Sequence, residues 1–215
     1  LAVVLPWLLQ DRIEAMTVLG LLMAIWAFAL TVAEVIERAT DRQGLWQGLR
    51  KLSRSHWGMV AGHVGMAVTV VGIAFSQSYS IERDVRMKPG DSVDIHHYHF
   101  VFKDVHNITG PNYSGGAGLI EVQRNGHHEA TLRAEKRFYS ASRQVMTEAA
   151  IDGGLTRDLY AALGEELDGG SWAVRLYYKP FVRWIWYGGA LMALGGLLCM
   201  LDPRYRLRKS LKEAS

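Results

Sequence analysis

His63 is the residue whose type and position most strongly indicate chemistry, because it lies within an apolar run long enough to cross a membrane. A histidine inside a membrane span is costly and therefore points to a function. His56, Met59, His63 and Met66 follow a three- and four-residue spacing, so a helix places them on one face. Imidazole is a usual axial ligand of haem iron, and a second ligand from another helix would complete a b-type haem site. From the residues alone, this ligation and a hydrogen bond across a helix interface are equally good interpretations.

The neighbours of His63 allow two interpretations as well. Gly58, Gly62 and Gly65 flank the histidine face, and small residues permit either close helix packing or the approach of a flat macrocycle. His56 lies at the mouth of the span next to Trp57 and is interpreted as an interfacial histidine in contact with water. The two methionines of this face are interpreted as packing residues. His63 is therefore the single predicted iron ligand and cofactor-binding residue, and no catalytic residue is predicted.

The remaining histidines are clustered in the polar part of the chain: His96, His97, His99, His106, His127 and His128. His97 and His99 would share one face of a strand, a spacing open to a metal, but zinc normally requires three or four protein ligands. No cysteine or carboxylate trio completes such a site, so these histidines are expected on the surface and His96, His97 and His99 are given no role. The sequence also contains no nucleophile–base pair, phosphate loop or dinucleotide fingerprint, which argues against a hydrolase.

A basic and aromatic cluster is the other candidate binding feature. It comprises residues 135–139 (EKRFY) together with Arg175, Tyr177, Tyr178 and Lys179. Arginine recognises carboxylates through paired donors, so the cluster would suit a haem propionate or a protein partner. For each residue taken singly, a strand position facing solvent near the membrane is the simpler interpretation.

Three almost uncharged segments set the architecture that must position these residues. Runs of about 20 apolar residues cross a bilayer as helices, and the mean hydropathy of +0.02 hides their segregation from a polar middle part. The predicted fold class is a membrane α-helical protein with three transmembrane helices and an inserted small β-rich periplasmic domain. Its predicted parts are the end of a preceding segment (1–15), a first span (16–36), a cytoplasmic loop with an amphipathic helix (37–55), the span carrying His63 (56–75), the β-rich domain (76–181), a third span (182–201) and a basic cytoplasmic tail (202–215).

Lys and Arg near the spans predict the orientation, since cytoplasmic loops are enriched in both. The link between the first two spans contains Arg38, Arg42, Arg50, Lys51 and Arg54, against Glu37 and Asp41, and the tail contains Arg204, Arg206, Arg208, Lys209 and Lys212. The protein is therefore expected in the bacterial inner membrane as a multi-pass protein, with residues 76–181 in the periplasm. The net charge of +3 is explained by these flanks, so no nucleic-acid partner is expected.

The β-rich domain is predicted from alternation and turn residues. Residues 92–102 alternate, with Tyr98, Phe100 and Phe102 on one face, and residues 172–179 alternate in the same way. Asn125-Gly126 between residues 118–124 and 127–133 predicts a type I′ hairpin, because both positions accept positive φ. Only residues 155–163 of this domain are predicted to be helical.

Several motifs in one order resemble the CcmF haem lyase family. They are residues 55–65 (SHWGMVAGHVG), 110–113 (GPNY), 135–139 (EKRFY), 146–149 (MTEA), 157–165 (RDLYAALGE), 172–189 (WAVRLYYKPFVRWIWYGG) and 202–206 (DPRYR). The resemblance covers nearly the whole chain beyond about residue 40.

The resemblance implies a role in system I cytochrome c biogenesis. It implies that the full protein takes haem from a periplasmic haem chaperone, attaches it to apocytochrome c and works with other cytochrome c maturation membrane proteins. It also implies a haem b in the lipid bilayer, held by one histidine from an early span and one from a late span, with His63 at the late position. That haem would supply reducing equivalents.

Two family features have no match in this chain. These are the tryptophan-rich periplasmic segment with its flanking histidines, and the early-span partner histidine. The chain is therefore expected to need the remainder of the same polypeptide or a split amino-terminal subunit. The alternative to a haem lyase component is a non-catalytic membrane scaffold whose periplasmic domain docks maturation partners, and a third class is an electron-transfer subunit of a respiratory complex.

Overall fold

The computed structural model describes residues 1–40 and 45–203 of the 215-residue chain. Asp41 and Arg42 of the predicted link and the five basic residues of the predicted tail lie outside the described residues. The chain forms two compact units, one made of Leu1–Ser78 with Phe181–Ser215 and the other of Tyr79–Pro180. Two neighbouring segments of the first unit, residues 1–78 and 181–215, are therefore separated in the sequence by the whole of the second unit.

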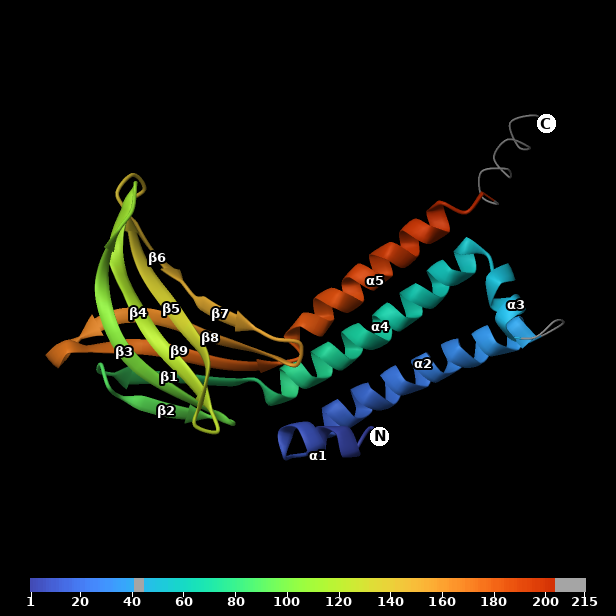
Figure 1. Cartoon of the computed structure of the whole chain (residues 1–215), viewed down its shortest axis with the longest axis horizontal. Coiled ribbons are helices and arrows are strands. Elements are labelled where there is room, and N and C mark those ends of the chain that lie inside the picture. The colour runs from blue at the N-terminus through green and yellow to red at the C-terminus, as the bar shows by residue number, and fades with distance from the viewer. Residues whose placement is uncertain (41–44, 204–215) are drawn as a thin grey trace. The chain divides into compact units, whose positions relative to one another are not determined.

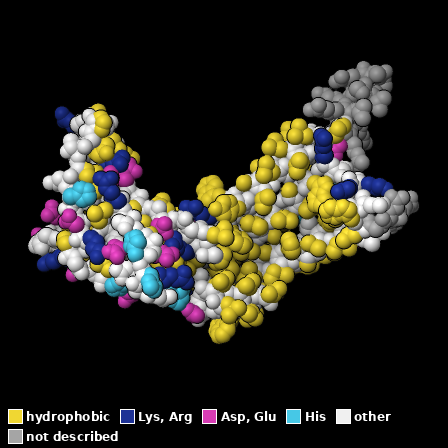
Figure 2. Space-filling view, viewed as in Figure 1, with side chains coloured by type: hydrophobic (Ala, Val, Ile, Leu, Met, Phe, Trp, Pro, Cys, Tyr) yellow, Lys and Arg dark blue, Asp and Glu magenta, His cyan; other side chains and the backbone are white. Residues whose placement is uncertain are grey.

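The first unit is helical (Figure 1). Its elements are α1 (Val4–Gln10), α2 (Ala15–Thr40), α3 (Leu45–Lys51), α4 (Arg54–Tyr79) and α5 (Val182–Met200). Of the described helices, α2, α4 and α5 are long and apolar enough to cross a membrane. Figure 2 shows apolar side chains covering the surface of these helices, whereas charged and histidine side chains gather on the second unit. This distribution suits helices whose outer surface meets lipid or other apolar helices.

Hydrogen bonds between side chains of one helical segment and the backbone of another complement the apolar packing of the helical unit. Thr17 Oγ1 on α2 donates to the Ala74 carbonyl of α4 at 3.2 Å. The buried Asp202, just after α5, accepts a hydrogen bond from the Ser55 N–H at 2.9 Å. Because the first N–H groups of a helix have no partner within the helix, this carboxylate caps the start of α4 from a distant part of the sequence.

The second unit is a sandwich of two antiparallel sheets (Figure 1). One sheet has the order β1-β9-β8-β7 and the other β2-β3-β4-β5-β6. The strands are β1 (Ile81–Met87), β2 (Ser92–Ile95), β3 (Tyr98–Thr109), β4 (Tyr113–Arg124), β5 (His127–Tyr139), β6 (Gln144–Glu148), β7 (Ala150–Gly153), β8 (Arg157–Leu167) and β9 (Ser171–Pro180). The predicted fold class is confirmed: three apolar helices accompany a β-rich domain.

The core of the sandwich follows the predicted alternation. Phe100 and Phe102 are completely buried and Tyr98 is 5% exposed, while Val174, Leu176 and Tyr178 line the inner face of β9. Each strand thus presents alternate side chains to the facing sheet. The predicted hairpin at Asn125-Gly126 is also confirmed, with φ angles of 51° and 77°.

Two local predictions are wrong. Residues 92–102 form two strands, β2 and β3, because a turn at His96-His97 separates them. Residues 157–163 of the predicted helix (155–163) belong instead to the strand β8, in which Leu159, Ala161 and Leu163 are fully buried. This segment is rich in good helix formers, but pairing with β7 and β9 buries every second side chain, and that burial outweighs the weak intrinsic preference.

Arg157 joins three strands to β8 and should be important for the stability of the sandwich. Its guanidinium donates to Tyr98 Oη at 3.1 Å, to Glu129 at 2.7 Å and to Asp152. Burial lowers the pKa of Arg157, but hydrogen bonds to Tyr98, Asp152 and Glu129 outweigh burial and raise the pKa further above its ordinary value.

Replacing this arginine by methionine is expected to destabilise the second unit. Loss of a buried partner costs roughly 3–5 kcal/mol, but Glu129 and Asp152 are about a third exposed, so we expect Arg157→Met to cost about 2 kcal/mol. Thermal unfolding followed by near-UV circular dichroism measures the change. Arg133→Met, which removes an arginine that is 53% exposed, is the control and should have little effect. Equal unfolding midpoints for the two variants would contradict the proposed role of Arg157.

Candidate functional site

His63 lies on a face of α4 that the other described helices leave uncovered. Its side chain is exposed, and Met66, nearly one turn further along, is 45% exposed. A Cβ placed on the adjacent Gly62 would meet nothing within 4 Å. The imidazole therefore projects from the helical unit beside a stretch of helix with no side-chain bulk. These residues would allow a flat group to approach α4 next to a nitrogen ligand.

The glycines near His63 fall into two groups. A Cβ on Gly58 would lie 2.5 Å from the Gly195 carbonyl oxygen, and a Cβ on Gly65 would lie 2.6 Å from that of Gly188. Gly58 and Gly65 therefore permit close packing of α4 against α5. Gly62 alone of the three leaves open space on its side of the helix.

His56 occupies a different environment from the one predicted. The expectation of an interfacial histidine in contact with water is wrong, because the residue is only 8% exposed. Its Nδ1 atom lies 3.8 Å from Oε1 of Glu34 on α2. The same oxygen of Glu34 also forms an ion pair with Nε of Arg38, at 2.6 Å. The contact between His56 and Glu34 was not predicted. The sequence indicated it only through an acidic residue near the end of one apolar helix and a histidine at the start of the next.

The basic and aromatic cluster of β5 is engaged within the sandwich. Arg137 donates to Glu135 at 2.8 Å and to Tyr139 Oη at 3.4 Å, and its guanidinium lies 4.5 Å from the Tyr113 ring centre. The hydrogen bonds to Tyr139 and Glu135 raise the pKa of Arg137 further above its ordinary value. Lys136 is paired with Glu165 of β8. These internal partners make Arg137 and Lys136 poor candidates for binding a propionate.

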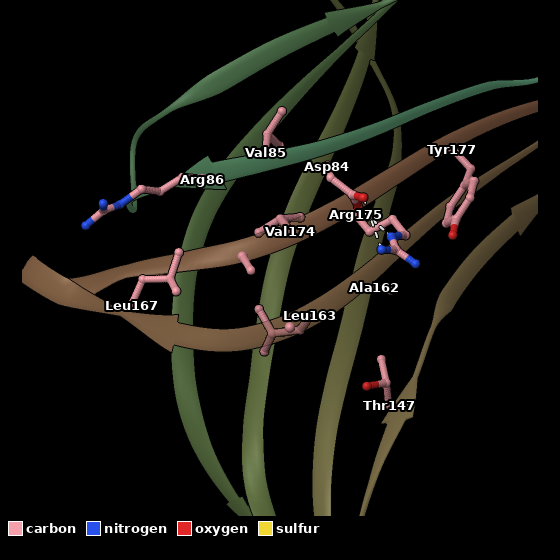
Figure 3. Close-up of a pocket in the computed structure, with 12 residues that line it drawn as sticks. Asp84, Val85, Arg86, Thr147, Ala162, Leu163, Leu167, Val174, Arg175 and Tyr177 are labelled. Atoms are coloured by element: carbon pink, nitrogen blue, oxygen red, sulfur yellow. Dashed lines mark hydrogen bonds and ion pairs between the residues drawn. The ribbon is translucent and has the colours of Figure 1, made fainter.

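Arg175 and Tyr177 of the predicted cluster border a hollow in the second unit (Figure 3), whereas Tyr178 is buried in the core of the sandwich. The hollow has a volume of about 550 Å³ and includes the small residues Ala162, Gly164 and Ala173 among its lining. Arg175 and Asp84 point toward each other at its rim, and Nη2 of Arg175 donates to Oδ2 of Asp84 at 3.0 Å. This contact raises the pKa of Arg175 further above its ordinary value. The hollow was not predicted; small residues at outward positions of neighbouring strands were the available signal.

The histidines of the turn region do not form the strand face that the sequence suggested. His96 and His97 make the turn between β2 and β3, with φ of 55° at His96, so His97 does not lie in a strand with His99. The His96 ring stacks on Tyr178, with 4.6 Å between ring centres. His99 lies on β3, where Nδ1 is 2.6 Å from Oδ1 of Asp94. These contacts give His96 and His99 structural roles in the sandwich.

Comparison with known proteins identifies the second unit as a known domain and relates nearly the whole chain to longer proteins. Residues 78–180 match the family model described as the CcmF C-terminal beta-sandwich. The chain is 62% identical over 210 residues to the cytochrome c-type biogenesis protein CcmF of Escherichia coli (strain K12), covering 98% of this chain and 31% of that protein. It is 58% identical over 209 residues to CcmF of Haemophilus influenzae, covering 97% of this chain and 32% of that protein.

A solved structure of a protein named cytochrome c heme lyase CcmF has the same fold. It superposes with a TM-score of 0.74 over 93% of this chain and 33% of that one, at 22% sequence identity. The chain thus spans about a third of the length of the relatives that it matches. The sequence identity, the matched carboxy-terminal sandwich and the shared fold show that this chain belongs to the CcmF family of cytochrome c-type biogenesis proteins.

Proposed function

We propose that this chain is the part of a cytochrome c haem lyase that holds a haem b in the membrane through His63. The observation that carries the proposal is the exposed imidazole beside the open side of Gly62, on a face of α4 that α2 and α5 leave uncovered. A histidine in this position has a nitrogen ligand to offer and room for a macrocycle next to it. A further ligand would come from a segment that packs against this face.

The residues of this chain would bind and orient the haem. His63 would supply one nitrogen ligand, Gly62 leaves space at the helix surface, and the glycine contacts with α5 hold α4 in place. When bound, such a haem supplies one-electron redox chemistry, whose potential depends on its ligands and surroundings. The lyase as a whole would receive haem from a periplasmic haem chaperone and transfer it to apocytochrome c, together with other maturation membrane proteins and with the rest of its own polypeptide or a split amino-terminal subunit.

The test is carried out on the full-length protein. The purified protein should give the visible spectrum and pyridine haemochrome of haem b, and cells that lack it should lose their c-type cytochromes. A purified protein free of haem, from cells that make c-type cytochromes only in its presence, would reject the bound haem and retain the maturation role. Haem in the protein with unchanged c-type cytochromes in its absence would instead favour an electron-transfer subunit.

The runner-up function is a non-catalytic membrane scaffold whose sandwich docks maturation partners. The hollow of about 550 Å³ beside Arg175 favours it. So do the apolar side chains Phe138, Val145 and Met146, which are 43–56% exposed on β5 and β6. Cavities of this size and exposed apolar side chains are common features of binding sites. Absence of haem b from the purified full-length protein would favour this function over the first.

We further propose that the sandwich is periplasmic in a bacterial inner membrane and that α3 faces the cytoplasm. Arg38, Arg50, Lys51 and Arg54 lie around α3, and basic residues favour the cytoplasmic side. Single cysteines at Ser142 and at Gln47, in a Cys199→Ser background, would report the two sides. A membrane-impermeant maleimide should label position 142 in cells with a permeabilised outer membrane, and position 47 only after the inner membrane is disrupted. The reverse pattern would contradict this topology.

A further inference from the structure

His56 is a buried titratable residue with one ring nitrogen that has no assigned role. The residue is 8% exposed, and its Nε2 atom is buried without a hydrogen-bond partner among the residues that the structure describes. Leaving a buried polar atom unsatisfied costs about 1–3 kcal/mol, so such an atom in a folded protein requires an explanation. A nitrogen that binds a proton during function is one such explanation, because its lone pair must then be kept available.

The other ring nitrogen of His56 faces a carboxylate. Nδ1 lies 3.8 Å from Oε1 of Glu34, which belongs to the neighbouring helix α2. This separation is too long for a hydrogen bond, but the negative charge of Glu34 favours the tautomer that carries its proton on the facing Nδ1 and leaves the lone pair on Nε2. It also stabilises the imidazolium that forms when Nε2 takes up a proton. His56 and Glu34 together therefore have the composition of a proton-binding pair.

The charges around this pair are nearly balanced. Glu34 is neutralised in part by Arg38, at 2.6 Å, and the carboxylate of Asp202 is bonded to the N–H of Ser55. The charged and titratable groups that the structure describes at this end of the helical unit are Glu34, Glu37 and Arg38 on α2, Arg50 and Lys51 on α3, Arg54 on α4, Cys199 on α5 and Asp202 after α5. Among the described residues, four basic side chains face three acidic ones here, so their net charge is small and a further charge nearby can change the protonation of His56.

We propose that His56, with Glu34, is a proton-binding site that is linked to the oxidation state of the haem held at His63. This inference rests on the proposed function, since it requires that haem. Seven residues separate the two histidines, which places them on nearly the same face of α4, about 10 Å apart along the axis. Reduction adds one negative charge at the haem. At an effective dielectric constant of about 20, that charge changes the proton affinity of a group about 10 Å away by roughly tenfold.

The linked step is balanced. One electron from a one-electron reductant converts ferric to ferrous iron, and one proton from water binds Nε2 of His56, so an N–H bond forms and no other bond breaks in the protein. The charge of the buried region is then unchanged by reduction. Burying an uncompensated charge in a low-dielectric region is costly, and proton uptake removes that cost.

The experiment is a potentiometric titration of the haem in the full-length purified protein, with dithionite as reductant, at several values between about pH 5.5 and pH 8.5. In the wild type, reduction should become harder as the pH rises, by up to about tenfold in the equilibrium constant per pH unit over part of this range. His56→Gln should keep its haem and lose this dependence. Glu34→Gln should weaken the dependence near pH 7. His127→Gln, which changes an exposed histidine of the sandwich, is the matched control and should behave like the wild type.

The outcomes separate this inference from the proposed function. A haem-loaded His56→Gln protein with the same pH dependence as the wild type would overturn the inference and leave the haem assignment intact. A wild-type protein without haem b would overturn both. If His56→Gln does not fold, Glu34→Gln decides, because a haem-loaded Glu34→Gln protein with an unchanged pH dependence would also overturn the inference.

Discussion

His63→Ala is expected to lose most of its haem b, whereas the wild-type full-length protein keeps it. The physical reason is the loss of the nitrogen ligand that His63, a side chain projecting from α4, would offer to the iron. Removing an outer-shell partner of a metal ligand already costs about 10–100-fold in affinity, so removing the ligand itself should cost at least as much. The pyridine haemochrome of each purified variant, expressed per mole of protein, measures the loss.

Matched variants make this result specific to ligation. His127→Ala removes an exposed histidine of the sandwich and should retain the haem. His63→Gly should regain haem absorbance when imidazole is added, because the open side of Gly62 leaves room for a free ligand next to the vacated position. Wild-type haem content in His63→Ala would reject the ligand assignment, and with it the linked proton site at His56.

Gly188→Val is expected to prevent the close packing of α4 against α5. A Cβ at position 188 would collide with Oγ1 of Thr69 and with the Gly65 carbonyl oxygen, and it would lie 2.6 Å from the Thr69 backbone nitrogen. Two of these three atoms belong to a helix backbone, so no side-chain rotation relieves the collision. Overpacking in a well-packed contact costs about 1–3 kcal/mol, and a valine against backbone should reach at least the upper end of that range.

The neighbouring glycine provides the control for this prediction. A Cβ on Gly189 would meet nothing within 4 Å, so Gly189→Val has the same change in composition and helix propensity without the collision. The detergent-solubilised protein is heated, and the fraction that remains monodisperse is measured by size-exclusion chromatography. The midpoint temperature should fall by several degrees in Gly188→Val and change little in Gly189→Val. Equal losses in both variants would mean that helix propensity, and not close packing, explains the effect.

The pattern of residues alone was sufficient for much of the fold. Three segments with few charges predicted the three apolar helices, because length and hydropathy decide whether a helix can cross a membrane. The alternation of Tyr98, Phe100 and Phe102 predicted their burial, because successive side chains of a strand point to opposite faces. Asn125-Gly126 predicted its hairpin, because few other residues accept positive φ at two consecutive positions.

The local sequence pattern predicted the wrong secondary structure where the same residues were compatible with two structures. Residues 157–167 contain Leu, Ala and Glu, which suit a helix, yet they lie between β7 and β9 in a sheet. The strand at 92–102 was divided by His96 at a φ of 55°, a conformation that histidine accepts less readily than glycine or asparagine. In both segments, contacts with residues far away in the sequence decided the conformation.

For the candidate site, the sequence by itself determined the residue types: a histidine inside an apolar helix, three glycines beside it and a second histidine at the helix start. Only the tertiary structure decided which glycines pack against α5, which one remains open, and that His56 is buried against Glu34 while His63 is exposed. The helical period places both histidines on nearly the same face and so cannot distinguish them. They differ because neighbouring helices cover one part of that face and not the other, and that covering depends on segments remote in the chain.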